Sequence, residues 1–189
     1  ACNLQVECIS FFRRIPDAPV AFELDPASEL KHRSLAHPDG LGFSSCGTWL
    51  AVANHGNHSV SIYERRESAD STGRPEYGPS PVAILNDATM RFPHSVAFTP
   101  KTHHLVVTNA GANHFSVYEP KFSEIGVRWS HAPISQTTVG PHREFREVNM
   151  LNKMEGGPKG VAIHGNRLAV CSPEFGVKIY AFREWDVAG

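Results

Sequence analysis

The sequence Phe-Pro-His-Ser-Val-Ala-Phe at positions 92–98 decides the fold, because it recurs in altered form at two other places. The related segments are His-Pro-Asp-Gly-Leu-Gly-Phe at 37–43 and Gly-Pro-Lys-Gly-Val-Ala-Ile at 157–163. Each contains a proline, a residue of variable type, a small residue and an apolar-small-apolar triplet. Such a triplet, with little polar content on either face, is typical of a buried strand. Self-similarity of this kind indicates a repeat architecture.

The residues after each motif repeat as well. A polar turn leads into a second apolar strand, which ends at Asn54, Asn109 or Ser172. A short loop then reverses the chain. The third strand alternates apolar and polar residues, as a half-buried strand does, at 59–63, 114–118 and 176–180. We expect a more variable fourth strand at 81–85 and at 147–151.

The first residues of the chain form an incomplete copy of the same unit. Segments 2–3 and 9–12 match 53–54 and 60–63 with the same spacing, and a fourth strand is expected at 21–24. Four short strands per repeat are typical of a β-propeller blade. A sandwich also fits the coarse strand pattern, but one motif repeated in the same phase favours the propeller. We therefore predict an all-β fold of about three to three and a half four-stranded antiparallel blades.

The predicted strands leave the propeller ring open. The sequence predicts about 13 to 14 strands in a single domain over 1–189, with surface loops at about 66–80 and 120–146. Propellers close with typically 4–8 blades of four strands. An open array leaves unpaired strand edges and exposed apolar faces, which favour association. Either the chain is a piece of a longer propeller, or two copies close a six- or seven-bladed ring as a homodimer.

Composition and charge exclude several classes of partner. The formal net charge is −1 at pH 7, and no basic stripe or polybasic run predicts binding to nucleic acid or to a membrane surface. No apolar run approaches the ~20 residues of a membrane span. We expect a soluble protein and favour the cytoplasm. The sequence contains neither a C-x-x-C pair nor a G-x-S-x-G elbow, so a zinc ribbon and a serine nucleophile are not predicted.

The repeated residues resemble one family. The motif at 37–43, Trp-Leu-Ala-Val-Ala-Asn-His-Gly at 49–56 and Ser-Val-Ser-Ile-Tyr at 59–63 are similar to a blade of the lactonase-like β-propellers. These include the 6-phosphogluconolactonase type and the YVTN-type repeat proteins. Segments 92–98 and 105–109 resemble a second blade. The chain has about half the usual family length, so a family site built from blades around the whole ring is incomplete in one copy.

The resemblance implies that the innermost strand of each blade starts near the central channel. The variable motif residues Asp39, His94 and Lys159 would then face the channel from successive blades. A carboxylate, an imidazole and an ammonium group can together bind a polar or anionic ligand. They can also hydrolyse a lactone, with His94 as general base and Lys159 stabilising the oxyanion. The alternative is that they satisfy backbone groups or meet channel water.

A second set of candidate ligand-binding residues is Asn3, Asn54 and Asn109, which end the second strands. Asparagine also suits turns, because it tolerates left-handed backbone and bonds its own backbone. Calcium-dependent propeller lactonases imply, by analogy, Ca²⁺ binding at these asparagines, but Ca²⁺ prefers six to eight oxygens with carboxylates among them. We predict no cofactor, with Ca²⁺ as the alternative. The eleven histidines lack a metal-binding spacing, so we predict no metal site.

Two functions remain open at this point. We favour a propeller that binds a small polar ligand or a partner at its central channel or loop face and closes a ring as a homo-oligomer. The alternative is a lactonase-like hydrolase that uses the channel-facing acid and base residues.

Overall fold

The structure is a computed structural model that describes residues 1–15, 21–66, 76–141 and 155–182. Within these ranges the chain consists of strands and connecting turns, with one short 3-10 helix, η1 (His55–Asn57). The described part of the chain has no helix that is long and apolar enough to cross a membrane. The all-β fold expected from the repeats is confirmed.

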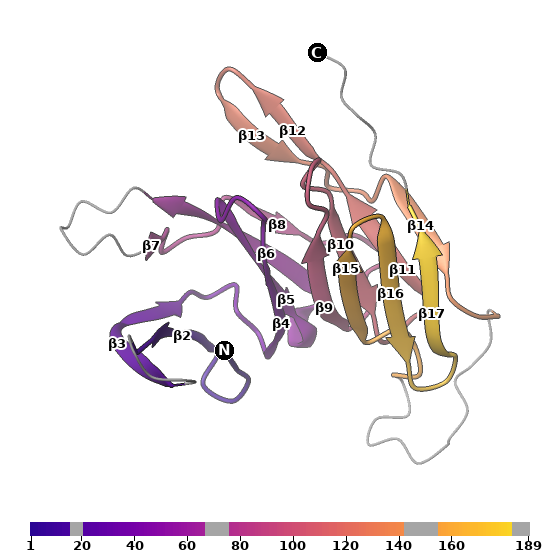
Figure 1. Cartoon of the computed structure of the whole chain (residues 1–189), viewed down its shortest axis with the longest axis horizontal. Helices are drawn as coiled ribbons and strands as arrows, with labels where there is room; N and C mark the ends of the chain where they lie inside the picture. Colours follow the sequence, from indigo (N-terminus) through magenta and orange to yellow (C-terminus); the bar gives the residue numbers. More distant parts are fainter. Residues whose placement is uncertain (16–20, 67–75, 142–154, 183–189) are drawn as a thin grey trace.

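Four antiparallel sheets of three or more strands follow one another in chain order across the molecule (Figure 1). The first sheet contains β1 (Cys2–Asn3), β2 (Cys8–Arg14) and β3 (Phe22–Lys31). The second sheet contains β4 (Pro38–Phe43), β5 (Trp49–Asn54), β6 (Ser59–Arg66), β7 (Glu76–Tyr77) and β8 (Ala83–Leu85). The third sheet contains β9 (Pro93–Phe98), β10 (Leu105–Asn109), β11 (His114–Tyr118) and β14 (Ser135–Thr138). The fourth sheet contains β15 (Gly160–His164), β16 (Arg167–Ser172) and β17 (Gly176–Ala181).

These sheets reproduce the strand order expected for propeller blades. The second and third sheets each begin with the motif strand, β4 or β9, and end with a fourth strand that pairs with the third. The first sheet lacks a motif strand, as the incomplete N-terminal copy predicts. In the second sheet the fourth strand is β8, within the predicted segment 81–85.

The third sheet differs from the sequence-based expectation. A surface loop is expected over 120–146, but this segment contains the hairpin of β12 (Pro120–Ser123) and β13 (Gly126–Trp129), followed by β14. The strand that pairs with β11 is β14, and the fourth strand predicted at 147–151 lies outside the described residues. The segment expected as a surface loop therefore contains three strands within its described part. Most of the other expected loop, at 67–75, also lies outside the described residues.

The core lies between neighbouring sheets. Side chains alternate between the two faces of a strand. The second and third sheets therefore pack against a neighbouring sheet on each of their two faces. The first and second sheets enclose a cluster that includes Ile9, Leu30, Leu50, Val52 and Tyr63. The second and third sheets enclose Ile62, Leu85, Val96, Leu105 and Tyr118. The third and fourth sheets enclose Val106, Phe115, Leu168 and Val170.

The motif strands β4, β9 and β15 contact one another in this order. Their approach is close, because a Cβ atom on Gly40 would lie only 2.3 Å from the carbonyl oxygen of His94. The absence of a side chain at Gly40 therefore lets β4 and β9 pack backbone against backbone. This packing brings the variable residues of consecutive sheets to the same end of the molecule.

Candidate functional site

The three motif residues predicted to share a site do meet at the start of the motif strands. Asp39 lies on β4, His94 on β9, and Lys159 directly before β15. Atom Nε2 of His94 is 3.2 Å from Oδ2 of Asp39. The side chains of all three remain about 30% exposed, so solvent or a ligand can reach them. The structure thus brings the three together; their use in binding or catalysis stays a prediction.

The environment of His94 favours its neutral form. Burial is the largest influence and lowers the pKa of His94 below its usual value; Asp39 opposes this, while Lys159 and His55 lower the pKa further. The Nε2 atom of His94 faces Oδ2 of Asp39 at 3.2 Å, and the two groups form an ion pair when the imidazole is protonated. A neutral imidazole at this position can accept a proton.

Lys159 has its own acidic partner, which the sequence-based reasoning missed. Its Nζ atom lies 2.8 Å from Oε2 of Glu155, and the other carboxylate oxygen of Glu155 lies 2.9 Å from Nε2 of His55. Glu155 is buried, with 6% of its surface exposed. The candidate site therefore contains two histidine–carboxylate pairs, His94–Asp39 and His55–Glu155, and one lysine.

The aromatic ring of Phe92 lies beside this cluster. The ring of Phe92 packs against His55 and His58 at centroid distances of 4.9 and 4.5 Å. The backbone N–H of Phe92 donates a hydrogen bond to Nδ1 of His58. Burial lowers the pKa of His58, and the nearby Arg91 lowers it further. His58 therefore serves as a hydrogen-bond acceptor that fixes the loop before β9.

The asparagines predicted to bind a ligand lie inside the sheets. Asn54 and Asn109 are fully buried. Each accepts a hydrogen bond from a backbone N–H just before the motif strand of its own sheet, that of Ala36 or Arg91. Each amide also donates to the hydroxyl of a serine seven residues later, as does that of Asn3; these serines are Ser10, Ser61 and Ser116. These hydrogen bonds give the three asparagines a structural role. They do not support the predicted role of the asparagines in ligand binding.

Among the residues that the structure describes, no group of three or more His, Cys, Asp or Glu side chains is arranged to hold a metal ion. The carboxamide oxygens of Asn54 and Asn109, the atoms that Ca²⁺ would bind, already accept from the backbone N–H groups of Ala36 and Arg91. We therefore derive no step through a metal ion.

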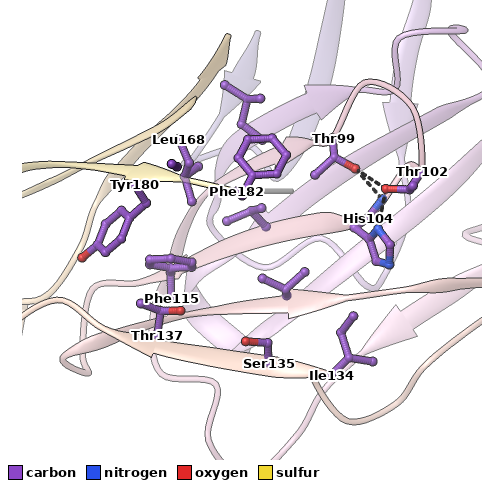
Figure 2. Close-up of a pocket in the computed structure, with 14 residues that line it drawn as sticks. Thr99, Thr102, His104, Phe115, Ile134, Ser135, Thr137, Leu168, Tyr180 and Phe182 are labelled. Atoms are coloured by element: carbon purple, nitrogen blue, oxygen red, sulfur yellow. Dashed lines mark hydrogen bonds between the residues drawn. The ribbon is translucent and has the colours of Figure 1, made fainter. Parts of the chain in front are cut away.

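A separate cavity of about 280 Å³ lies between the third and fourth sheets (Figure 2). Its wall is mainly apolar and includes Phe115, Leu168, Tyr180 and Phe182. Thr102 lies at one edge and contacts His104 and Thr99 (Figure 2). None of the residues of the two histidine–carboxylate pairs lines this cavity. This cavity lies at the contact between two sheets and is not part of the candidate site.

Sheets of this topology, with their motif strands gathered at one side, define a β-propeller. A family model described as "Lactonase, 7-bladed beta-propeller" matches residues 20–141, which is more than half of the chain. The chain therefore belongs to this lactonase propeller family, as the resemblance of its motifs implies.

Solved structures agree with this fold. A protein from Bacteroides uniformis, provisionally named a 6-phosphogluconolactonase, matches with a TM-score of 0.62 and 12% identity over 95% of this chain and 49% of the other. A functionally unknown protein from Desulfotomaculum acetoxidans matches with a TM-score of 0.57 and 14% identity over 94% of this chain and 49% of the other. At these identities the likeness concerns the fold alone. This chain spans about half the length of both proteins. No curated protein matches the sequence.

Proposed function

We propose that this protein binds a small polar ligand with an anionic group where its motif strands begin. The observation that carries the proposal is the contact between His94 and Asp39 within electrostatic reach of Lys159. Lys159 can donate to a carboxylate or phosphate, and Asp39 can accept from a hydroxyl group. Membership of the lactonase family supports a sugar acid or a lactone as the ligand class.

Isothermal titration with gluconate and 6-phosphogluconate tests this proposal. We expect Lys159→Ala and His94→Ala to weaken binding about tenfold or more, since a hydrogen bond to a charged group contributes about 1.5–3 kcal/mol. Lys121→Ala is the matched control, because this lysine lies on the β12–β13 hairpin and is largely exposed. Equal affinity in all four proteins, or no binding by the wild type, would contradict the proposal.

Lactone hydrolysis is the second candidate function, and the lowered pKa of His94 favours it. In this reaction neutral His94 accepts a proton from water as the water oxygen bonds to the lactone carbonyl carbon. Lys159 stabilises the resulting oxyanion, and Asp39 stabilises the imidazolium. The ring C–O bond then breaks, and the leaving alkoxide takes the proton back from His94. The product is a hydroxy acid.

Turnover of δ-gluconolactone, corrected for spontaneous hydrolysis, separates the two candidates. If the protein is a hydrolase, His94→Ala lowers the rate by ~10²–10⁴, the usual contribution of general acid–base catalysis. A wild-type protein that binds gluconate but does not accelerate the hydrolysis of a panel of lactones is a binding protein.

We further propose that the sheets complete a ring, either with a second copy or within a longer propeller. Apart from the two-stranded β12–β13 hairpin, the described residues contribute four sheets. Two identical chains contribute equal numbers of sheets, so two copies would close an eight-sheet ring with incomplete sheets at the two junctions. The six- or seven-bladed homodimer expected from the strand number stays a prediction beside this alternative.

A further inference from the structure

The position of Glu155 in the repeat is the unusual feature of the candidate site. Glu155 lies three residues before the motif proline Pro158, as Leu35 and Met90 do before Pro38 and Pro93. The hydrogen bonds support this alignment, because the carbonyl that follows each residue, in Ala36, Arg91 and Gly156, accepts from the equivalent loop N–H of Gly56, Gly111 or Glu174. Leu35 and Met90 are buried core residues. The fourth sheet thus has a carboxylate where two other sheets have an apolar side chain.

A buried carboxylate at this position is costly for the fold. Removing a charge from water requires compensation from partners, and an ion pair replaced by well-packed apolar residues is often neutral or stabilising. Leu or Met would suffice for packing, as Leu35 and Met90 show. The presence of Glu155 therefore needs an explanation other than stability.

The contacts of Glu155 supply that explanation. One carboxylate oxygen faces Lys159 and the other faces His55, at 2.8 and 2.9 Å. His55 comes from η1 of the second sheet, and Lys159 precedes the first strand of the fourth sheet. Glu155 therefore links two sheets across the intervening β9, which carries His94. Because Nε2 of His55 meets the carboxylate, its Nδ1 atom faces away from Glu155.

We infer that Glu155 is a positioning residue that holds the ammonium group of Lys159 and the ring of His55 in place at the ligand-binding site. The inference rests on the proposed function, since Lys159 is the group that meets the anionic part of the ligand. Glu155 acts through these two side chains and contacts no ligand itself. The same carboxylate adds negative charge near His94, which raises the pKa of His94 against the larger effect of burial.

Two substitutions separate positioning from packing. Glu155→Leu restores the apolar residue of the other repeats, and Glu155→Gln keeps the shape but removes the charge. We expect Glu155→Leu, which leaves Lys159 and His55 without their carboxylate, to stay folded and to bind 6-phosphogluconate about tenfold more weakly. Glu155→Gln should weaken binding by less, because its carbonyl still accepts from Lys159. Glu29→Gln, in the exposed pair Glu29–Lys31, is the control and should change neither property.

A histidine titration by NMR gives a readout that needs no ligand. The groups that influence His94 are Asp39, Lys159, His55 and Glu155. Removing the charge of Glu155 should lower the pKa of His94 in both variants and leave it unchanged in Glu29→Gln. Wild-type affinity in Glu155→Leu, or an unchanged pKa of His94 in both variants, would overturn the inference. If the wild type binds no probe, the proposed function fails, and the titration still decides whether Glu155 acts on His94.

Discussion

Single asparagines fix the loops from which the candidate site is built. Asn54 is fully buried at the end of β5 and connects three parts of the second sheet. Its side chain accepts from the N–H of Ala36, before β4, and donates to Ser59 and Ser61 on β6. His55 follows directly in the chain. The asparagine thus holds the loop before the motif strand against the loop that presents His55.

We predict that Asn54→Ala destabilises the protein by about 2–3 kcal/mol, because each buried polar group left without a partner costs about 1–3 kcal/mol. Urea unfolding followed by tryptophan fluorescence measures the change. Asn109→Ala should cost a similar amount, since Asn109 makes the equivalent bonds in the third sheet. Wild-type stability in both variants would show that these hydrogen bonds do not hold the loops.

The pH dependence of stability follows from the histidines. Burial lowers the pKa of His94, His58 and His114 relative to the unfolded chain. The unfolded chain therefore binds more protons near pH 6, and stability falls as the pH falls. The stability that the neutral histidines provide is fully present above about pH 6.5, their usual pKa, and is lost as the pH drops through their lower folded-state pKa values.

We predict that the urea midpoint decreases between pH 7.5 and pH 5, and that His94→Asn has a shallower decrease. Burial opposes ionisation of Asp87, but hydrogen bonds from Thr89 and Tyr118 hold its pKa below the usual value of a carboxyl group, so Asp87 contributes little in this range. A midpoint that rises on acidification would contradict the prediction.

Sequence reasoning found part of the site because the motif recurs. Asp39, His94 and Lys159 occupy one repeat position, and three copies of the motif define that position without any structure. Glu155 lies outside the motif, in a segment without a regular pattern. A signal for it was nevertheless present, because the residue three positions before each motif proline is Leu35, Met90 or Glu155. Only the structure shows that this carboxylate reaches across to His55.

At the scale of elements, the hairpin of β12 and β13 projects outward beyond the sheets, and β13 contacts β8 of the second sheet (Figure 1). Trp129 on β13 is buried, and its ring packs on Trp49 of β5 and Phe98 of β9 at centroid distances of 5.8 and 6.0 Å. The turn of the hairpin projects outward, so that Ile125 is 84% exposed. The hairpin therefore stabilises the junction between two sheets through its base and not through its tip.

We predict that Trp129→Ala costs about 3–5 kcal/mol, as large aromatic deletions in cores do. Ile125→Ala, at the exposed tip, is the control and should change stability by less than about 0.5 kcal/mol. Chemical unfolding of the two variants measures both values. Equal stability of Trp129→Ala and the wild type would mean that the hairpin does not belong to the core.

The strand β14 shows why the sequence pattern missed a strand in the third sheet. β14 has the sequence Ser-Gln-Thr-Thr and its side chains are mostly exposed, so it lacks the apolar alternation that identifies a half-buried strand. It forms because β11 offers an unpaired edge, to which β14 bonds from Ser135 to Thr138. The motif strands, in contrast, contact one another, and their apolar triplets predict them directly, although β4 and β15 are only partly buried.

At the scale of the whole molecule, two sheet faces have no neighbour within the described chain. On the fourth sheet, Val177 and Ile179 are 71% and 65% exposed. Their equivalents by strand register on the third sheet are Phe115 and Val117, which pack against the fourth sheet. At the other end of the array Phe12 is 51% exposed, although its repeat equivalent Tyr63 is buried between sheets. Each open face therefore has the residues of a sheet–sheet contact.

We predict that the chain associates at micromolar concentration by packing the fourth sheet of one copy on the first sheet of another. Val177→Lys combined with Ile179→Lys places two charges on this face and should weaken association by tenfold or more, since burying unpaired charges is costly. Ile125→Lys introduces a lysine at the exposed hairpin tip and should leave association unchanged. Sedimentation velocity over a concentration series measures the apparent dissociation constant. A wild-type monomer across that series would rule out ring closure by a second copy and leave a longer propeller as the way to cover both faces.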